Sequence, residues 1–145
     1  MPNKEIWDSY ASWYEKLLAQ KFALGPSRKL ILKNITEIPG NAKILDVGCA
    51  IGQLCREIKN LHPTAVITGI DPAEKMIERA KTLSENTDIR YFATELEKLP
   101  DSEMFDIIVS TNAFPYVMDK KFFLQCVKNH LNPGGRLLIL FANNN

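Results

Sequence analysis

Short apolar runs alternate with longer amphipathic stretches along most of the chain. These runs have the length of strands and lie at residues 43–47, 65–70, 89–92, 105–110 and 136–141. Most of them lack the alternation of apolar and polar residues that is typical of a strand with one solvent-exposed face. Parallel strands have this pattern when helices cover both faces of their sheet. The pattern therefore predicts five buried parallel strands in one sheet.

Between and before these runs, apolar residues recur at steps of three and four, which is the spacing of one helix face. This spacing predicts four helices, at residues 6–24, 27–35, 53–60 and 122–131. Gly25-Pro26 is expected to separate the first two, and Ser27 is expected to cap the second.

Strands that alternate with helices in this way form a doubly wound α/β sheet. The chain of 145 residues has the length of one domain. We therefore expect a single domain over residues 1–145, in which residues 1–38 form a helical lid and residues 43–141 form the α/β core.

Composition and charge mainly argue against nucleic acid and membranes as partners of this chain. With 46% hydrophobic and 24% charged residues the chain is an ordinary globular sequence, and its net charge of +1 provides no electrostatic footprint for nucleic acid or an anionic membrane. No stretch approaches the roughly 20 apolar residues that span a bilayer. We expect a cytoplasmic protein that acts on a small molecule, with no nucleic-acid or membrane partner.

The three cysteines, Cys49, Cys55 and Cys126, include no CxxC pair. Neither a disulfide framework nor a metal site is predicted, and the cysteines are expected to be small buried residues.

The first strand leads into the sequence Asp46-Val47-Gly48-Cys49-Ala50-Ile51-Gly52. Gly48 and Gly52 allow a sharp turn close to a ligand, and the helix that follows would point its free N–H groups at that ligand. A dinucleotide fingerprint needs glycines at the first, third and sixth places, but counting from Gly48 the latter two are alanine and glutamine. This excludes an NAD site. Because Ala50 carries a Cβ atom, it is expected to keep a negative φ.

The second strand ends at Asp71, which lies 19 residues beyond Gly52. An acid at this place in an open α/β sheet can accept hydrogen bonds from both hydroxyls of a ribose. Alternatively, Asp71-Pro72 is the N-cap and first turn of the next helix. The two roles can coexist.

Four segments, in order, resemble the motifs of class I S-adenosylmethionine-dependent methyltransferases. They are the glycine loop at 46–52, the second-strand segment 69–77, the strand 105–110, and Leu131-Asn132-Pro133-Gly134-Gly135 before the last strand. The resemblance implies a Rossmann-like fold, S-adenosyl-L-methionine as the cofactor, S-adenosyl-L-homocysteine as its product, and methyl transfer to a small-molecule acceptor.

The resemblance also implies roles for individual residues. Asp71 would hold the ribose, Met76 would pack on adenine, and Glu95 would accept a hydrogen bond from the adenine amino group beside the Leu96 amide. A solvated charge is the alternative for Glu95. The full set of cofactor-binding residues implied is Asp46, Gly48, Cys49, Ala50, Gly52, Asp71, Pro72, Met76, Thr94, Glu95, Leu96, Ser110, Asn112, Tyr10 and Tyr14.

No general base is evident in the segment that follows the fourth strand, where Pro115 stands at the place of a histidine in many relatives. The candidates for orienting a nucleophile or surrounding the sulfonium are Asn112, Tyr116 and Tyr14. The aromatic residues of the first helix, including Tyr10, either form a pocket wall or pack that helix on the sheet.

Family members normally continue into two further strands, whereas this sequence stops shortly after the fifth. The fifth strand is therefore expected to be an apolar edge that is shielded either by self-association or by the amino-terminal helices. Two functions stay open: methyl transfer to a small molecule, and binding of S-adenosylmethionine by a module without catalysis on its own.

Overall fold

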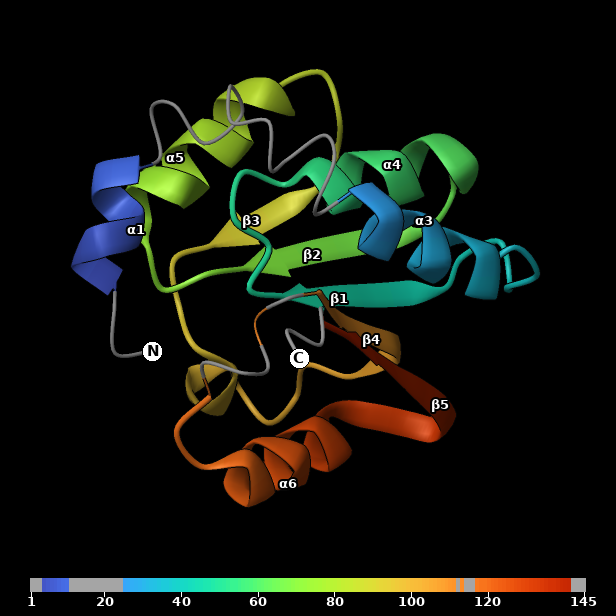
Figure 1. The fold of residues 1–145 in the computed structure, drawn as a ribbon. Helices are drawn as coiled ribbons and strands as arrows, with labels where there is room; N and C mark the ends of the chain where they lie inside the picture. The colour runs from blue at the N-terminus through green and yellow to red at the C-terminus, as the bar shows by residue number, and fades with distance from the viewer. Residues whose placement is uncertain (1–3, 11–24, 112, 114–116, 142–145) are drawn as a thin grey trace.

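The structure, a computed structural model, describes residues 4–10, 25–111, 113 and 117–141. Five parallel strands form one sheet in the order β3-β2-β1-β4-β5 (Figure 1), which confirms the predicted doubly wound α/β fold. The strands are β1 Lys43–Val47, β2 Val66–Ile70, β3 Arg90–Phe92, β4 Phe105–Thr111 and β5 Leu131–Leu140.

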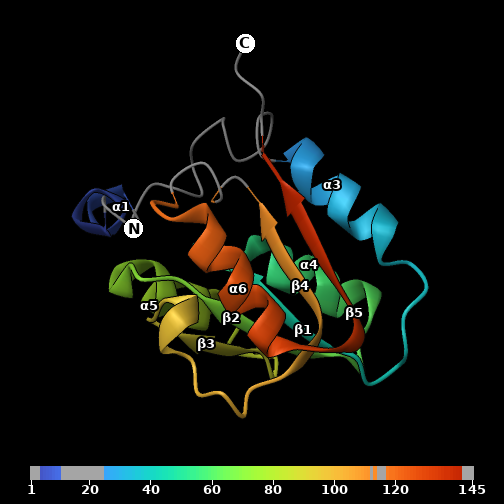
Figure 2. The ribbon, with the colours of Figure 1, turned by 90° about the horizontal axis from the view of Figure 1, so that it is seen from below.

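Helices cover both faces of this sheet. Figure 1 shows α3, α4 and α5 on one side and α6 on the other, and Figure 2 shows α6 in front of the strands. The helices are α1 Lys4–Tyr10, α3 Gly25–Asn34, α4 Gln53–Leu61, α5 Glu74–Leu83, the 3-10 turn η2 Leu96–Lys98 and α6 Lys120–His130.

Two apolar clusters hold these layers together, one on each face. Ile44 and Ile67 point into the cluster formed with α3, α4 and α5, whereas Leu45 and Ile70 point into the cluster formed with α6. Neighbouring strand residues thus face opposite layers, as the pleat of a strand requires. The absence of polar alternation in the sequence reflects burial on both faces. All three cysteines are free and buried, as predicted.

Among the predicted boundaries that are wrong are the starts of α3 and β5. The helix expected from Ser27 begins at Gly25, because proline in the first helical turn gives up an N–H that has no partner there. β5 begins at Leu131 rather than at residue 136. The pairing of β5 with β4 shifts in register between Phe105 and Ile107, and Gly134 has a positive φ. These two irregularities allow β5 to include the Pro-Gly-Gly segment.

Residues 11–24 of the predicted first helix lie outside the described residues, so the division into lid and core stays a prediction. Within the described ranges, no helix combines the length and the apolarity needed to cross a bilayer.

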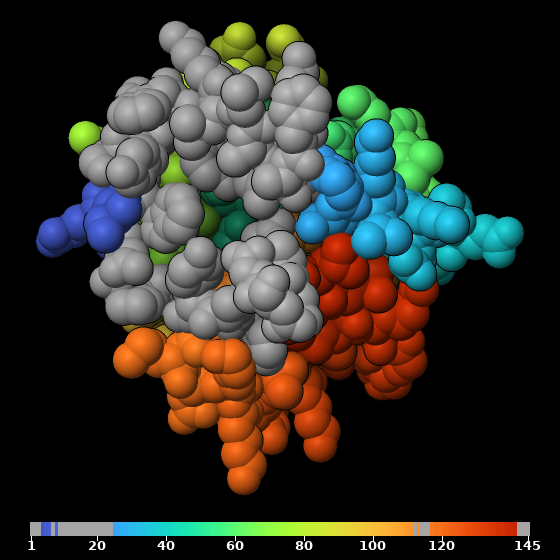
Figure 3. All heavy atoms as spheres, viewed as in Figure 1, coloured from blue at the N-terminus to red at the C-terminus, as the bar shows by residue number. Residues whose placement is uncertain are grey.

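β5 pairs with β4 on one side and with no described strand on the other. On the face shown in Figure 3, its residues lie at the surface between α3 and α6. We predict that an edge with unpaired backbone groups and half-buried leucines promotes self-association. Light scattering over a concentration series should show a mass that rises above that of the monomer. A monomer mass at every concentration would contradict the prediction.

Candidate functional site

The loop between β1 and α4 is held at the carboxyl end of the sheet. The N–H groups of Gly48 and Cys49 both donate to the carbonyl of Ile70, at 2.8 and 3.0 Å. Three of five loop residues are left-handed, with φ of 76° at Gly48, 48° at Ala50 and 79° at Gly52. The loop is therefore a tightly coiled segment fixed to the end of β2.

The expectation of a negative φ at Ala50 is wrong. Its backbone N–H donates to Oδ2 of Asp71 at 3.0 Å, and this bond holds the residue in the left-handed region. A residue with a Cβ atom loses roughly 1–2 kcal/mol there. A bond to a carboxylate offsets that strain.

Replacement of Ala50 by glycine should therefore stabilise the domain. The change removes the left-handed strain, while the extra freedom of glycine in the unfolded chain costs roughly 0.5–1 kcal/mol. The net gain in the free energy of unfolding should be up to about 1.5 kcal/mol, measured by urea denaturation. A loss of stability in Ala50→Gly would show that the alanine is not strained.

Asp71 lies where β2 ends, with a relative exposure of 8%. Its Oδ1 accepts the N–H of Ala73 at 2.9 Å, and its Oδ2 accepts that of Ala50. Burial raises the pKa of this carboxyl group, and the hydrogen bonds from these two amides oppose the rise. The N-cap of α5 is Ala73, so the alternative that Asp71 caps the helix is wrong. Asp71 instead ties the glycine loop to the segment that leads into α5.

Asp46 is buried beneath the loop. Its Oδ2 accepts a hydrogen bond from Sγ of Cys55 at 3.5 Å, while no described residue donates to its Oδ1. Burial raises the pKa of Asp46 to about 7, and the nearby charge of Asp71 adds to the rise. An acceptor without a donor in an apolar surrounding is costly, unless a ligand supplies the donor.

A cavity of about 230 Å³ opens beside this loop at the carboxyl ends of β1, β2 and β4. Six of the residues predicted for cofactor binding line it, namely Gly48, Pro72, Thr94, Glu95, Leu96 and Ser110. The hydroxyl of Ser110 donates to the carbonyl of Val47 at 3.0 Å and ties the ends of β4 and β1 together.

The other predicted residues with described positions do not line this cavity. Asp46, Cys49, Ala50, Gly52 and Asp71 belong to the loop and its supports. Met76, expected against adenine, is 1% exposed and packs with Ile51 and Ala73 below the loop. Asn112, Tyr116 and Tyr14 lie outside the described residues, as does the side chain of Tyr10, and their roles stay predictions.

The wall that α6 contributes to the cavity is not among the sequence predictions. Val117, Met118, Asp119, Phe122 and Phe123 line the cavity from the segment that enters this helix. The side chain of Asp119 caps α6 by accepting the N–H of Phe122 at 2.9 Å. The available signal was Asp119, a residue typical of an N-cap, in the connection between β4 and the next helix, because such connections border the crevice of an open α/β sheet.

Residues 44–135 match the model of a protein family that is described as a methyltransferase domain. The malonyl-[acyl-carrier protein] O-methyltransferase of Bacillus anthracis is 35% identical over 96 residues, which are 66% of this chain and 36% of that protein. The ubiquinone biosynthesis O-methyltransferase of Bradyrhizobium diazoefficiens is 31% identical over 108 residues, 73% of this chain and 42% of that protein. The matched stretches thus cover less than half the length of these two relatives.

Solved structures show the same fold. A putative methyltransferase in complex with the Haloferax volcanii Trm112 methyltransferase activator has a TM-score of 0.79 at 21% identity, over 92% of this chain and 58% of that chain. The plantazolicin methyltransferase BpumL was solved in complex with a desmethylPZN analog and SAH. It has a TM-score of 0.71 at 22% identity, over 98% of this chain and 54% of that chain.

Proposed function

Because the chain belongs to the class I S-adenosylmethionine-dependent methyltransferases, we propose that it binds S-adenosyl-L-methionine at the carboxyl ends of β1 to β4. We further propose that it takes part in transferring the methyl group to a small-molecule acceptor, which leaves S-adenosyl-L-homocysteine. The observation that carries the proposal is the bond between the left-handed loop at Ala50 and the carboxylate of Asp71.

The free acceptor sites of Asp71 support its role toward the ribose. A carboxylate has about four lone-pair positions, and the amides of Ala50 and Ala73 occupy one on each oxygen. The remaining positions can accept the two ribose hydroxyls without releasing the loop. This arrangement supports a ribose at Asp71 and the methionyl portion beside Gly48.

Adenine fits the cavity next to this position. Leu96 and Phe123 give it apolar walls, and Glu95 provides a carboxylate that can accept a hydrogen bond from the adenine amino group. At the other end of the cofactor, Oδ1 of Asp46 is a buried acceptor without a described donor. We propose that it attracts the methionyl ammonium group, directly or through water.

The chemistry requires mainly alignment from the protein. When bound, the cofactor would supply a methyl group on a positively charged sulfur, so that an acceptor could attack the methyl carbon in line while the sulfur leaves with the electron pair of the carbon–sulfur bond. The loop, Asp71 and the cavity walls would orient this group and exclude water, and proximity of this kind contributes several kcal/mol. The names of the two relatives favour an oxygen acceptor.

Titration calorimetry with S-adenosyl-L-homocysteine tests the binding step, with NADH as the control ligand. We expect binding of the first and none of the second; the opposite result would overturn the proposal. Methyl transfer from labelled cofactor to phenolic and carboxylic acceptors then separates an enzyme from a binding module, because a module would bind without turnover.

A further inference from the structure

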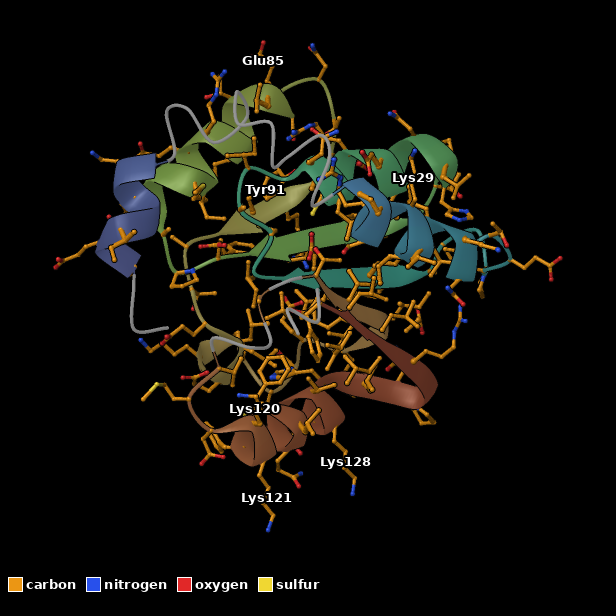
Figure 4. All side chains as sticks on the ribbon, in the orientation of Figure 1. Lys29, Glu85, Tyr91, Lys120, Lys121 and Lys128 are labelled. Carbon is orange, nitrogen blue, oxygen red and sulfur yellow. The ribbon has the colours of Figure 1, made fainter. Side chains whose placement is uncertain are left out.

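Tyr91 lies beneath the glycine loop rather than in the cavity. It is the central residue of β3 and pairs in register with Gly69 of β2. Figure 4 shows Tyr91 at β3, on the side of the sheet that α4 and α5 cover. A Cβ atom on Gly69 would lie 2.8 Å from Cδ1 of Tyr91, and one on Gly52 would lie 2.8 Å from its Cζ. The ring therefore fills the space that both glycines leave.

A polar chain continues from the ring to the loop backbone. The hydroxyls of Tyr91 and Ser84 are hydrogen-bonded at 2.9 Å. Ser84 Oγ also accepts a hydrogen bond from Nη1 of Arg56 at 3.3 Å. The same nitrogen donates to the carbonyl of Ile51 at 2.6 Å. Ile51 lies between Ala50 and Gly52, which are both left-handed. The guanidinium group thus holds the loop at the point where the backbone is most constrained.

Burial raises the pKa of Tyr91 well above its usual range, so its hydroxyl stays protonated and can act in this chain. Arg56, Ser84 and Tyr91 are all absent from the cavity lining. Any influence they have on a bound ligand must therefore pass through the loop.

We propose that Arg56, Ser84 and Tyr91 are positioning residues that hold the Gly48–Gly52 loop in its ligand-binding conformation. The inference rests on the proposed function, because it assigns a support to the same site. Its physical basis is preorganisation: a loop that is already ordered loses less conformational freedom when the ligand binds. Loss of the support should weaken cofactor binding more than it weakens the fold.

Arg56→Ala tests this proposal, with Lys59→Ala as the matched control. Lys59 lies on the same helix and also bonds a backbone carbonyl, that of Ala65 at 2.8 Å, but at the end of α4 away from the loop. We expect Arg56→Ala to weaken S-adenosyl-L-homocysteine binding about five- to tenfold, which is less than the loss of a charged hydrogen bond made directly to a ligand, because the effect passes through the loop. Lys59→Ala should leave the affinity unchanged.

Amide hydrogen exchange of the unliganded protein gives a second readout. The N–H of Gly52, bonded to the Cys49 carbonyl at 2.9 Å, should exchange about tenfold faster in Arg56→Ala and less so in Tyr91→Phe, which keeps the ring. Arg56→Lys should restore part of the protection, because lysine retains one donor. Unchanged exchange and affinity in Arg56→Ala would overturn the inference. If the wild-type protein failed to bind, the proposed function would fall, and the exchange rates would still decide whether these residues hold the loop.

Discussion

Replacement of Asp71 by alanine should lower the affinity for S-adenosyl-L-homocysteine by roughly 10- to 150-fold. Hydrogen bonds from neutral hydroxyls to a charged carboxylate contribute about 1.5–3 kcal/mol. The variant also removes the acceptor of the Ala50 amide, so the loop loses the bond that holds its left-handed residue. Calorimetry on the folded variant measures the loss.

Asp88→Ala is a suitable control, because Asp88 is an exposed acid that pairs with Lys59 at 2.7 Å, outside the cavity. Its affinity should equal that of the wild type. An unchanged affinity in Asp71→Ala, with the circular dichroism spectrum of a folded protein, would remove Asp71 from the binding site.

The second large effect concerns the pH dependence of stability in Asp46→Asn. The folded pKa of Asp46 is about 7, against 3.8 for an ordinary aspartate. Between these values the folded state binds more protons than the unfolded state, so the free energy of unfolding falls as pH rises from about 4 to about 7. A difference of about three pKa units corresponds to a decrease on the order of 4 kcal/mol. Because asparagine cannot ionise, the Asp46→Asn variant should lack this decrease in the free energy of unfolding.

Urea denaturation of both proteins at pH 5 and pH 8 measures the difference. The stability gap between wild type and variant should move in favour of the variant as pH rises. The other ionisable groups near Asp46 are Cys55, Cys49 and Asp71, which remain in both proteins. Equal pH slopes in the two proteins would show that Asp46 does not titrate in this range.

The same substitution should weaken binding, because the unpartnered Oδ1 is the proposed acceptor for the methionyl ammonium group. Above pH 7, Asp46→Asn would thus raise the free energy of unfolding while it lowers the affinity for the cofactor. A carboxylate that destabilises the free domain and serves its ligand agrees with the general finding that functional sites are locally strained.

The sheet could be predicted from sequence because burial on both faces leaves an uninterrupted apolar run in each strand. The loop could be placed because glycines and an acid at a strand end have few other uses in such a sheet. The left-handed Ala50 could not be predicted, since its conformation depends on a bond to a carboxylate that is distant in sequence. The α6 wall and the position of the Tyr91 ring likewise depend on packing between segments far apart in the chain.

The placement of separate apolar clusters on the two faces of the sheet has a consequence for how mutations combine. Ile44 and Leu45 are adjacent in β1, but their side chains lie in different clusters on opposite faces of the sheet. Coupling between substitutions requires shared packing partners, whatever the distance along the chain. We therefore expect truncations at these two neighbours to be close to additive, whereas truncations at Ile44 and at Ile58 of α4, which belongs to the same cluster and lies 14 positions away, are expected to be coupled.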